Sequence, residues 1–305
     1  MNINNAKPFV KWAGGKRNLL NQFQELYPDN LNNIDTYIEP FVGGGAVFFE
    51  LANKYKFKKI ILNDINTTLV NTYTSIRDNV EQLIEILKVL QEKYNLCNET
   101  ERSELYYEIR EKFNISKLDP ESNKLKESAY FLFLNKTCFN GLYRENKKGL
   151  FNVPFGKYKN PSILDENNLR NSNKLLQNVE ILNIDFANLN KYINKNTFIY
   201  IDPPYRPLNQ TSSFNSYSKI EFDDDEQRRL AKWFAEANNL GAKLMLSNSN
   251  PKNINENDDF FDILYKDFNL FTVLANRSIN SKASKRGAIS EIVVVNYKVE
   301  QIALK

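Results

Sequence analysis

One stretch of this sequence combines residue types that could do chemistry at the end of a predicted strand. Residues 198–201 form a short run of β-branched and aromatic side chains, which is typical of a buried strand. Asp202, Pro203, Pro204 and Tyr205 follow it directly. Two successive prolines cannot donate to a strand ladder or continue a helix, so the strand must end there. We therefore expect a carboxylate, a proline carbonyl and an aromatic ring at the carboxyl end of a strand, where open α/β sheets bind ligands.

This group of residues suits the methylation of an exocyclic amino group. The lone pair of adenine N6 is delocalised into the ring, so this nitrogen is a poor nucleophile. The Asp202 carboxylate and the Pro203 carbonyl would accept its two N–H groups and localise the lone pair, and Tyr205 would stack on a base taken out of the duplex. Taken alone, these residues also fit a strand that ends in an ordinary proline turn. The rest of the chain has to distinguish between the two interpretations.

The composition excludes several kinds of catalytic site. The chain has 305 residues, enough for one large domain or two, and is 42% hydrophobic and 26% charged, a globular balance. It has no histidine, which excludes Ser-His-Asp and Cys-His catalysis, and two distant cysteines, Cys97 and Cys138, argue against a zinc site. No segment resembles a signal peptide or a membrane span, so we expect a soluble cytoplasmic protein.

A glycine-rich turn lies between a predicted strand and a predicted helix in residues 37–51. Gly43, Gly44 and Gly45 would let the backbone approach a ligand at the helix N-terminus. A dinucleotide-binding loop would need a small residue at the position of Phe48. The turn therefore fits a cofactor with a sulfonium and an amino-acid end better than a pyrophosphate.

Two further acidic residues follow predicted strands. Asp64 closes the strand 59–63, about 20 positions after the glycines, where a nucleoside ribose is usually held. A strand over 180–184 ends at Asp185 and Phe186, whose carboxylate and ring would suit the amino edge and the face of a cofactor adenine. A plain strand-end turn is the alternative for both acids.

The remaining pattern predicts an α/β sheet with a helical insertion. Apolar residues recur at helical spacing over 67–95, 102–114 and 124–138, and no parallel-type strand is predicted between Asp64 and about residue 176. After the catalytic stretch we expect a long polar loop over 207–225. The later elements are expected to be a helix over 223–238 and strands over 242–247 and 291–297.

Two basic loops and a short N-terminal motif complete the candidate features. The segment 139–158 alternates aromatic, basic, Gly and Asn residues, which present stacking faces and donors to nucleic acid, and it also fits a β-hairpin with an exposed loop. A second basic loop covers 277–286. Gly14, Gly15 and Lys16 begin a helical pattern that could hold an anion, although it lacks the spacing of a P-loop.

Together these motifs resemble the Dam-like, D12-class DNA adenine-N6 methyltransferases with the alpha order of motifs. Residues 202–205 are similar to their catalytic motif, 11–16 to their N-terminal motif and 139–158 to their target-recognition hairpin. The resemblance implies a Rossmann-like, S-adenosylmethionine-dependent methyltransferase sheet with an inserted helical target-recognition domain. The catalytic domain would comprise 1–65 and 177–305, and the DNA-binding domain 66–176.

Pattern and resemblance together assign roles to individual residues. The predicted catalytic residues are Asp202, Pro203 and Tyr205. The predicted cofactor-binding residues are Trp12, Lys16, Phe41, Gly43, Gly45, Asp64, Asp185, Phe186 and Asp202. The predicted DNA-binding residues are Lys11, Phe139, Asn140, Leu142, Arg144, Pro154, Lys157, Arg277 and Arg286.

The resemblance implies that Phe139, where these enzymes commonly carry Tyr, wedges into the duplex beside the flipped adenine, and that Arg144 faces a guanine of GATC. The expected reaction is methyl transfer from S-adenosylmethionine to adenine in double-stranded DNA by direct displacement, with neither a covalent intermediate nor a metal. A cytosine-N4 methyltransferase, an RNA or protein-glutamine methyltransferase and a catalytically inactive DNA-binding module are the alternatives. A cognate restriction endonuclease acting on the same site would be a separate partner, with no direct contact implied.

Overall fold

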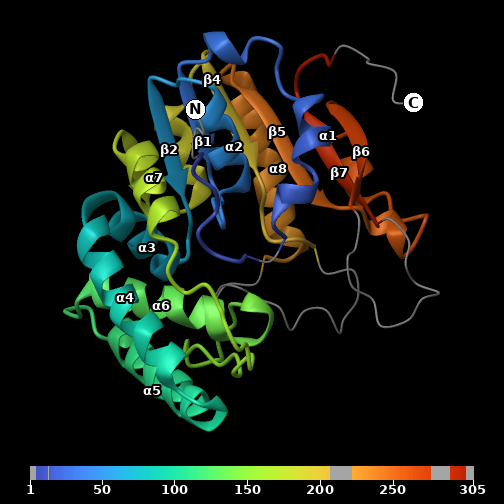
Figure 1. Ribbon diagram of the computed structural model, residues 1–305. Coiled ribbons are helices and arrows are strands. Elements are labelled where there is room, and N and C mark those ends of the chain that lie inside the picture. The colour runs from blue at the N-terminus through green and yellow to red at the C-terminus, as the bar shows by residue number, and fades with distance from the viewer. Residues whose placement is uncertain (1–4, 13, 207–221, 276–288, 300–305) are drawn as a thin grey trace.

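The computed structural model describes residues 5–12, 14–206, 222–275 and 289–299 (Figure 1). The predicted DNA contacts Arg277 and Arg286, and most of the polar loop after Tyr205, lie outside these residues. Seven strands form one sheet in the order β3-β2-β1-β4-β5-β7-β6. Their bounds are β1 Thr36–Glu39, β2 Lys59–Asn63, β3 Val179–Leu182, β4 Thr197–Ile201, β5 Lys243–Ser249, β6 Asn269–Ala275 and β7 Ile289–Val295.

The sheet is parallel over most of its width. Strands β3, β2, β1, β4 and β5 pair in parallel, whereas β7 pairs antiparallel with both β5 and β6. The predicted α/β class is therefore confirmed. The strand order reverses between β1 and β4, and in such sheets the crevice at this reversal point holds the ligand.

Helices cover both faces of the sheet and form a separate group beyond one of its ends. In Figure 1 the helices α4, α5 and α6 pack together below the strands. The helix bounds are α1 Leu20–Gln24, α2 Ala46–Lys54, α3 Thr67–Asp78, α4 Val80–Leu96, α5 Glu99–Leu118, α6 Lys124–Thr137, α7 Glu166–Leu176, α8 Asp224–Asn239 and α9 Phe260–Leu264. None of the helices in the described part of the chain is both long and apolar enough to cross a membrane.

The alternation of side chains along the strands divides the core into two clusters. Tyr37 in β1 and Phe198 in β4 point to one face of the sheet, whereas Ile38 and Ile199 point to the other. The first cluster continues without interruption into helices α3 to α6, for example through Phe113. The helical segment and the sheet therefore share one hydrophobic core, and the proposed division into two domains stays a prediction.

The helical insertion is present where it was predicted, since residues 64–178 contribute no strand to the sheet. The helical structure expected over 67–95 is confirmed, and it is divided into two helices, α3 and α4. The backbone leaves the helical region at Asn79, with φ −140° and ψ 39°, and both helices use this residue as a cap. Helices α7 and α9 and strand β6 were not predicted.

The segment 139–158, which also fitted a β-hairpin with an exposed loop, pairs antiparallel without forming a continuous ladder. Only two isolated bridges form there within the described residues, between Cys138 and Phe155 and between Glu145 and Phe151. Asn140 has φ 55°, inside a short 3₁₀ turn, so the chain turns where a ladder would continue. Pro154 has no N–H to donate, which further limits pairing.

Candidate functional site

A cavity of about 1370 Å³ lies where the parallel strands β1, β2, β3 and β4 end. Acidic residues mark the carboxyl ends of all four strands: Glu39, Asp64, Asp185 and Asp202. Because neighbouring parallel strands end at the same edge of a sheet, residues far apart in sequence meet there. The N-terminal segment around Trp12 and the glycine turn between β1 and α2 form other parts of the wall.

The glycine turn packs directly on the Trp12 side chain. Gly43 has φ +49°, and a Cβ there would lie 2.8 Å from Cδ1 of the Trp12 indole. Gly45, the N-cap of α2, has φ +69°, and a Cβ there would lie 2.5 Å from the Tyr73 hydroxyl oxygen. Both positions therefore require glycine for conformation and for space. The turn brings backbone to the cavity wall, as the sequence predicted.

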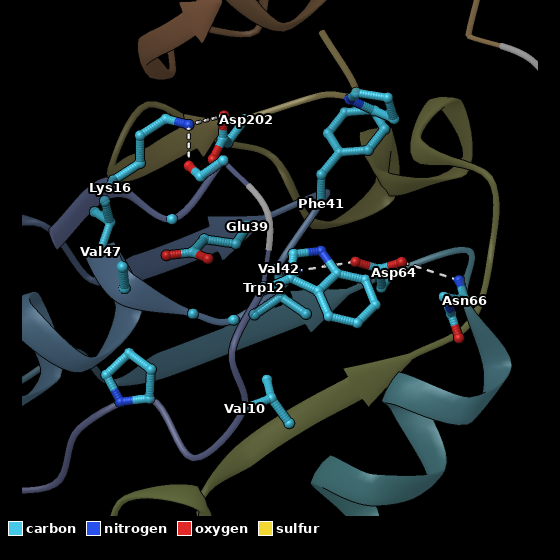
Figure 2. A pocket seen from close by; sticks show the side chains of 18 of the residues that line it. Val10, Trp12, Lys16, Glu39, Phe41, Val42, Val47, Asp64, Asn66 and Asp202 are labelled. Atoms are coloured by element: carbon cyan, nitrogen blue, oxygen red, sulfur yellow. Dashed lines mark hydrogen bonds and ion pairs between the residues drawn. The ribbon is translucent and has the colours of Figure 1, made fainter. Parts of the chain in front are cut away.

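Asp64 fixes this turn from the end of β2. Its Oδ2 accepts the Gly43 N–H at 3.0 Å, and its Oδ1 accepts the Asn66 N–H at 2.9 Å (Figure 2). Burial raises the pKa of the Asp64 carboxyl to about 6, although these backbone hydrogen bonds favour the ionised form. Asp64, which is predicted to bind the ribose, therefore also stabilises the glycine turn.

Glu39 is a cavity residue that the sequence analysis did not single out. Its side chain is 2% exposed, and the Tyr37 hydroxyl donates to its Oε1 at 2.5 Å. Burial raises the pKa of the Glu39 carboxyl to about 8. In Figure 2 it lies between the Lys16 and Asp202 side and the Trp12 and Asp64 side of the cavity. The signal was available, since Glu39 ends a predicted strand as Asp202 does.

The predicted catalytic motif is held by a buried lysine from the N-terminal segment. Lys16 is 2% exposed, and its Nζ lies 2.9 Å from Asp202 Oδ1 and donates to the Gly14 carbonyl at 2.6 Å (Figure 2). The Ser247 hydroxyl donates to the same Asp202 oxygen at 3.2 Å. Burial raises the pKa of the Asp202 carboxyl, and Lys16 opposes this rise. The structure thus joins two predicted site residues that are distant in sequence.

Tyr205 and the prolines line the same cavity. The Lys16 Nζ lies 4.5 Å from the centroid of the Tyr205 ring, and the Tyr205 hydroxyl donates to Glu291 Oε2 at 2.5 Å. Gln227 in α8 donates to the Pro204 carbonyl at 3.0 Å, which ties the motif to the helix behind it. Glu291, in β7, is a second residue that the sequence analysis read only as part of a strand.

Asp185 and Phe186 line the cavity but have strong protein partners. Arg229 makes a bidentate pair with Asp185, with both N···O distances 2.8 Å, and this pairing lowers the pKa of that carboxyl. The guanidinium also lies 4.1 Å from the centroid of the Phe186 ring. Phe186 packs against Phe41, with ring centroids 5.4 Å apart. Their roles toward a cofactor adenine stay predictions.

Most of the predicted DNA-binding side chains lie on the surface of the segment after α6. The exposed ones are Lys11, Phe139, Asn140, Arg144, Pro154 and Lys157, and Leu142 is half-buried. Arg144 Nε donates to Asn152 Oδ1 at 2.8 Å. The guanidinium is therefore held in position by a hydrogen bond to a neighbouring side chain.

The N-terminal segment connects this surface to the cavity. The Lys11 N–H donates to Asn135 Oδ1 at 2.8 Å, and Asn135 donates back to the Lys11 carbonyl at 2.8 Å. A Cβ on Gly141 would lie 2.5 Å from Lys11 Cδ, so the lysine stem packs on this turn. The Trp12 and Tyr143 rings are 5.5 Å apart.

Comparison with known proteins agrees with this geometry. Residues 12–279 match the family of D12 class N6 adenine-specific DNA methyltransferases. The chain is 52% identical over 295 residues to the Type II methyltransferase M.MjaIII of Methanocaldococcus jannaschii, covering 96% of this chain and 99% of that protein. It is 40% identical to the Type II methyltransferase M1.LlaDCHI of Lactococcus lactis subsp. cremoris, covering 96% of each chain. It is 34% identical to the DNA adenine methylase of Haemophilus influenzae, covering 95% and 93%. The resemblance seen in the motifs is confirmed: the chain belongs to the D12 class of N6 adenine-specific DNA methyltransferases.

Proposed function

We propose that this chain transfers a methyl group from S-adenosylmethionine to adenine N6 within GATC in double-stranded DNA, after the adenine has left the base stack. One observation carries the proposal. The catalytic motif of Asp202, Pro203 and Tyr205 opens on the same cavity as the glycine turn and Asp64. A nucleophile and a methyl donor could therefore meet in a single cavity.

The residues of the cavity fit S-adenosylmethionine. The glycine turn lines the cavity, and two carboxylates with raised pKa values, Glu39 and Asp64, suit a ligand that carries positive charge. Asp64 would take the ribose hydroxyls, and Glu39 a cationic group. When bound, this cofactor supplies an electrophilic methyl group on a positively charged sulfur.

The chemical step would depend on the catalytic motif. Asp202 and the Pro203 carbonyl would accept the two N–H groups of the adenine, draw N6 toward a tetrahedral geometry and localise its lone pair. Tyr205 would stack on the face of the ring. Because burial raises the pKa of Asp202, its carboxylate is a better acceptor for the proton that N6 gives up on methylation. This route requires neither a covalent enzyme intermediate nor a metal.

The size of the cavity supports base flipping. Its volume of about 1370 Å³ exceeds the roughly 300–1000 Å³ of a single small-molecule site, which leaves room for both a cofactor and a base. Phe139, 51% exposed, precedes the turn that packs on Lys11 at the cavity wall, so its ring could fill the space that the adenine leaves.

The DNA contacts would come mainly from the segment after α6. In this proposal residues 66–176 form the target-recognition domain, while 1–65 and 177–305 form the catalytic domain. Lys11, Asn140, Leu142, Arg144, Pro154 and Lys157 would face the duplex together with Phe139. Because two similar proteins are named Type II methyltransferases, we extend the proposal to a separate cognate restriction endonuclease that acts on the same site.

The test is methylation of defined duplexes by the purified protein. We expect N6-methyladenine at GATC, mapped by sequencing of methylated DNA. Asp202→Ala should lower the single-turnover rate constant by about 10²–10³-fold and leave DNA affinity nearly unchanged, because Asp202 acts on N6 in the transition state. Methylation at another sequence would remove GATC from the proposal. Methylcytosine as product, or near-normal turnover by Asp202→Ala, would contradict the proposed chemistry.

A further inference from the structure

Glu291 is a largely buried carboxylate in β7 that the reaction described so far does not use. Its side chain is 15% exposed, and β7 places it opposite Ser249 in β5. Its Oε2 accepts the Tyr205 hydroxyl and lies 3.9 Å from the Lys16 Nζ. Glu291 therefore contacts one proposed catalytic residue and the lysine that holds another.

Lys16 lies between two carboxylates. Its Nζ is 2.9 Å from Asp202 Oδ1 and 3.9 Å from Glu291 Oε2, and it donates to the Gly14 carbonyl. An ammonium has three donors, and a buried one is costly to leave without a negative partner. In the structure Asp202 is the nearer of the two carboxylates.

Methyl transfer places a second demand on Asp202. When its carboxylate takes up the proton that N6 gives up, it loses its negative charge, so its hold on Lys16 weakens and the buried ammonium needs another counter-charge. We propose that Glu291 is a positioning residue for this step: it holds the Tyr205 ring in place and takes over the Lys16 ammonium when Asp202 accepts the proton of the adenine amino group. The inference rests on the roles proposed above for Asp202 and Tyr205.

A similar group of side chains at the β3 edge of the sheet provides a control. The Tyr192 hydroxyl donates to Glu180 Oε1 at 2.7 Å, Lys59 Nζ lies 2.9 Å from Glu180 Oε2, and the same Nζ lies 4.7 Å from the centroid of the Tyr192 ring. This triad is outside the cavity, and Glu180 is 37% exposed. It has the same three residue types, but its lysine is not shared with a proposed catalytic carboxylate.

The test is Glu291→Gln, which keeps an oxygen that can accept the Tyr205 hydroxyl but removes the charge. We expect the single-turnover rate constant to fall about tenfold or more, with cofactor and DNA dissociation constants within about twofold of wild type. Glu180→Gln should turn over normally. An unchanged rate constant in Glu291→Gln would overturn the inference. If Glu291→Gln is as fast as wild type but Asp202→Ala is inactive, this inference fails and the proposed function still stands.

The pH profile separates positioning from a merely structural role. The groups that face Asp202 are Lys16 from the N-terminal segment, Tyr200 and Tyr205 beside it in the chain, Ser247 from β5, Glu39 from β1 and Glu291 from β7. Burial raises the pKa of the Glu291 carboxyl, and the charge of Asp202 raises it further. Because repulsion between two like charges is mutual, loss of the Glu291 charge should favour the ionised form of Asp202.

Removal of the Glu291 charge should therefore shift the acid limb of the single-turnover profile to lower pH. An equal loss of rate at every pH, accompanied by a lower unfolding temperature, would overturn the inference. Should Glu291→Gln not fold, Tyr205→Phe removes the hydroxyl contact and keeps the ring. Its rate constant should then fall by less than that of Asp202→Ala, and a wild-type rate constant would overturn the positioning of Tyr205.

Discussion

Four acidic side chains that follow parallel strands line one cavity, yet their surroundings shift their pKa values in different directions. Burial raises the pKa of Glu39 to about 8 and that of Asp64 to about 6, and it also raises that of Asp202. The bidentate Arg229 lowers that of Asp185. The direction of each pKa shift is therefore set by the groups around the carboxylate and not by the residue type. Glu39 and Asp64 are thus the two carboxylates best suited to gain from a positively charged ligand.

Glu39 should make the ligand-free protein less stable as the pH rises. Its pKa is about 8 in the folded protein against 4.5 for an ordinary Glu, so over this window the folded state binds a proton that the unfolded state has released. The free energy of unfolding then falls with rising pH. Glu39→Gln cannot ionise and should remove this loss, on the order of 3 kcal/mol at pH 7. Denaturant unfolding of both proteins from pH 5 to 8.5 checks this, and parallel curves would contradict it.

At the scale of elements, the glycine turn joins β1, α2 and the Trp12 segment. Gly43→Ala would strain a left-handed residue, at about 1–3 kcal/mol of stability, and its methyl group would push the indole away. We expect cofactor affinity to fall about tenfold, equivalent to about 1.4 kcal/mol. Calorimetric titration with S-adenosylmethionine measures this change.

Gly241, between α8 and β5, is the matched control for that variant. It has φ +88°, and a Cβ there would lie 3.3 Å from Lys195, away from the cavity. Gly241→Ala should lose stability to a similar extent but bind the cofactor normally. Equal affinity losses in the two variants would mean that general destabilisation, rather than the Trp12 contact, weakens binding.

The sequence predicted those parts of the site that follow from local pattern. The apolar runs and the residues that end them placed Asp64 and Asp202 correctly at strand ends, because strand, proline and glycine preferences are local. Two contacts could not be predicted in this way. The Lys16–Asp202 pair depends on how a segment before β1 crosses the end of β4, and Glu291 reaches the site only because β7 pairs with β5. Glu39 was missed although the strand-end rule that found Asp202 also applies to it.

Two details of these elements could not be predicted from the residue pattern. Apolar periodicity continues through Asn79, so it gives no sign that the backbone leaves the helix there. The segment after α6 also fitted a hairpin, but it contains a left-handed residue, Asn140, and forms two isolated antiparallel bridges in place of a ladder. In both places a single residue's backbone conformation decides the structure, and residue pattern does not specify it.

At the scale of the whole molecule, Lys11, Trp12 and Lys16 contact three parts of the proposed site. Lys11 is tied to Asn135 beside the predicted DNA-reading turn, Trp12 packs on the glycine turn, and Lys16 holds Asp202. The shared hydrophobic core joins the sheet and the helical segment as well. The residues proposed for DNA contact, cofactor binding and catalysis are therefore connected through contacts with Lys11, Trp12 and Lys16.

The last prediction concerns how the molecule reads its target. Arg144 is exposed, and its guanidinium is braced by Asn152, with Nε donating to Oδ1 at 2.8 Å and Nη2 to the carbonyl at 3.3 Å. A braced guanidinium fork can match guanine O6 and N7 at little further entropic cost. Arg144→Ala should therefore cost about 1–3 kcal/mol on GATC and relax specificity at one position. Methylation rates on GATC and on each one-base variant measure both effects.

A phosphate contact by Arg144 would give a different result. It would weaken binding to all sequences alike and reduce the salt slope by about one. Asn152→Ala is the control, because it keeps the guanidinium but removes one of its two supports. If Arg144 reads a guanine, Asn152→Ala should relax the same position by a smaller amount. A uniform loss across sequences in Arg144→Ala would exclude base reading, and the family membership of the chain would be unaffected because the catalytic motif and the glycine turn do not depend on this arginine.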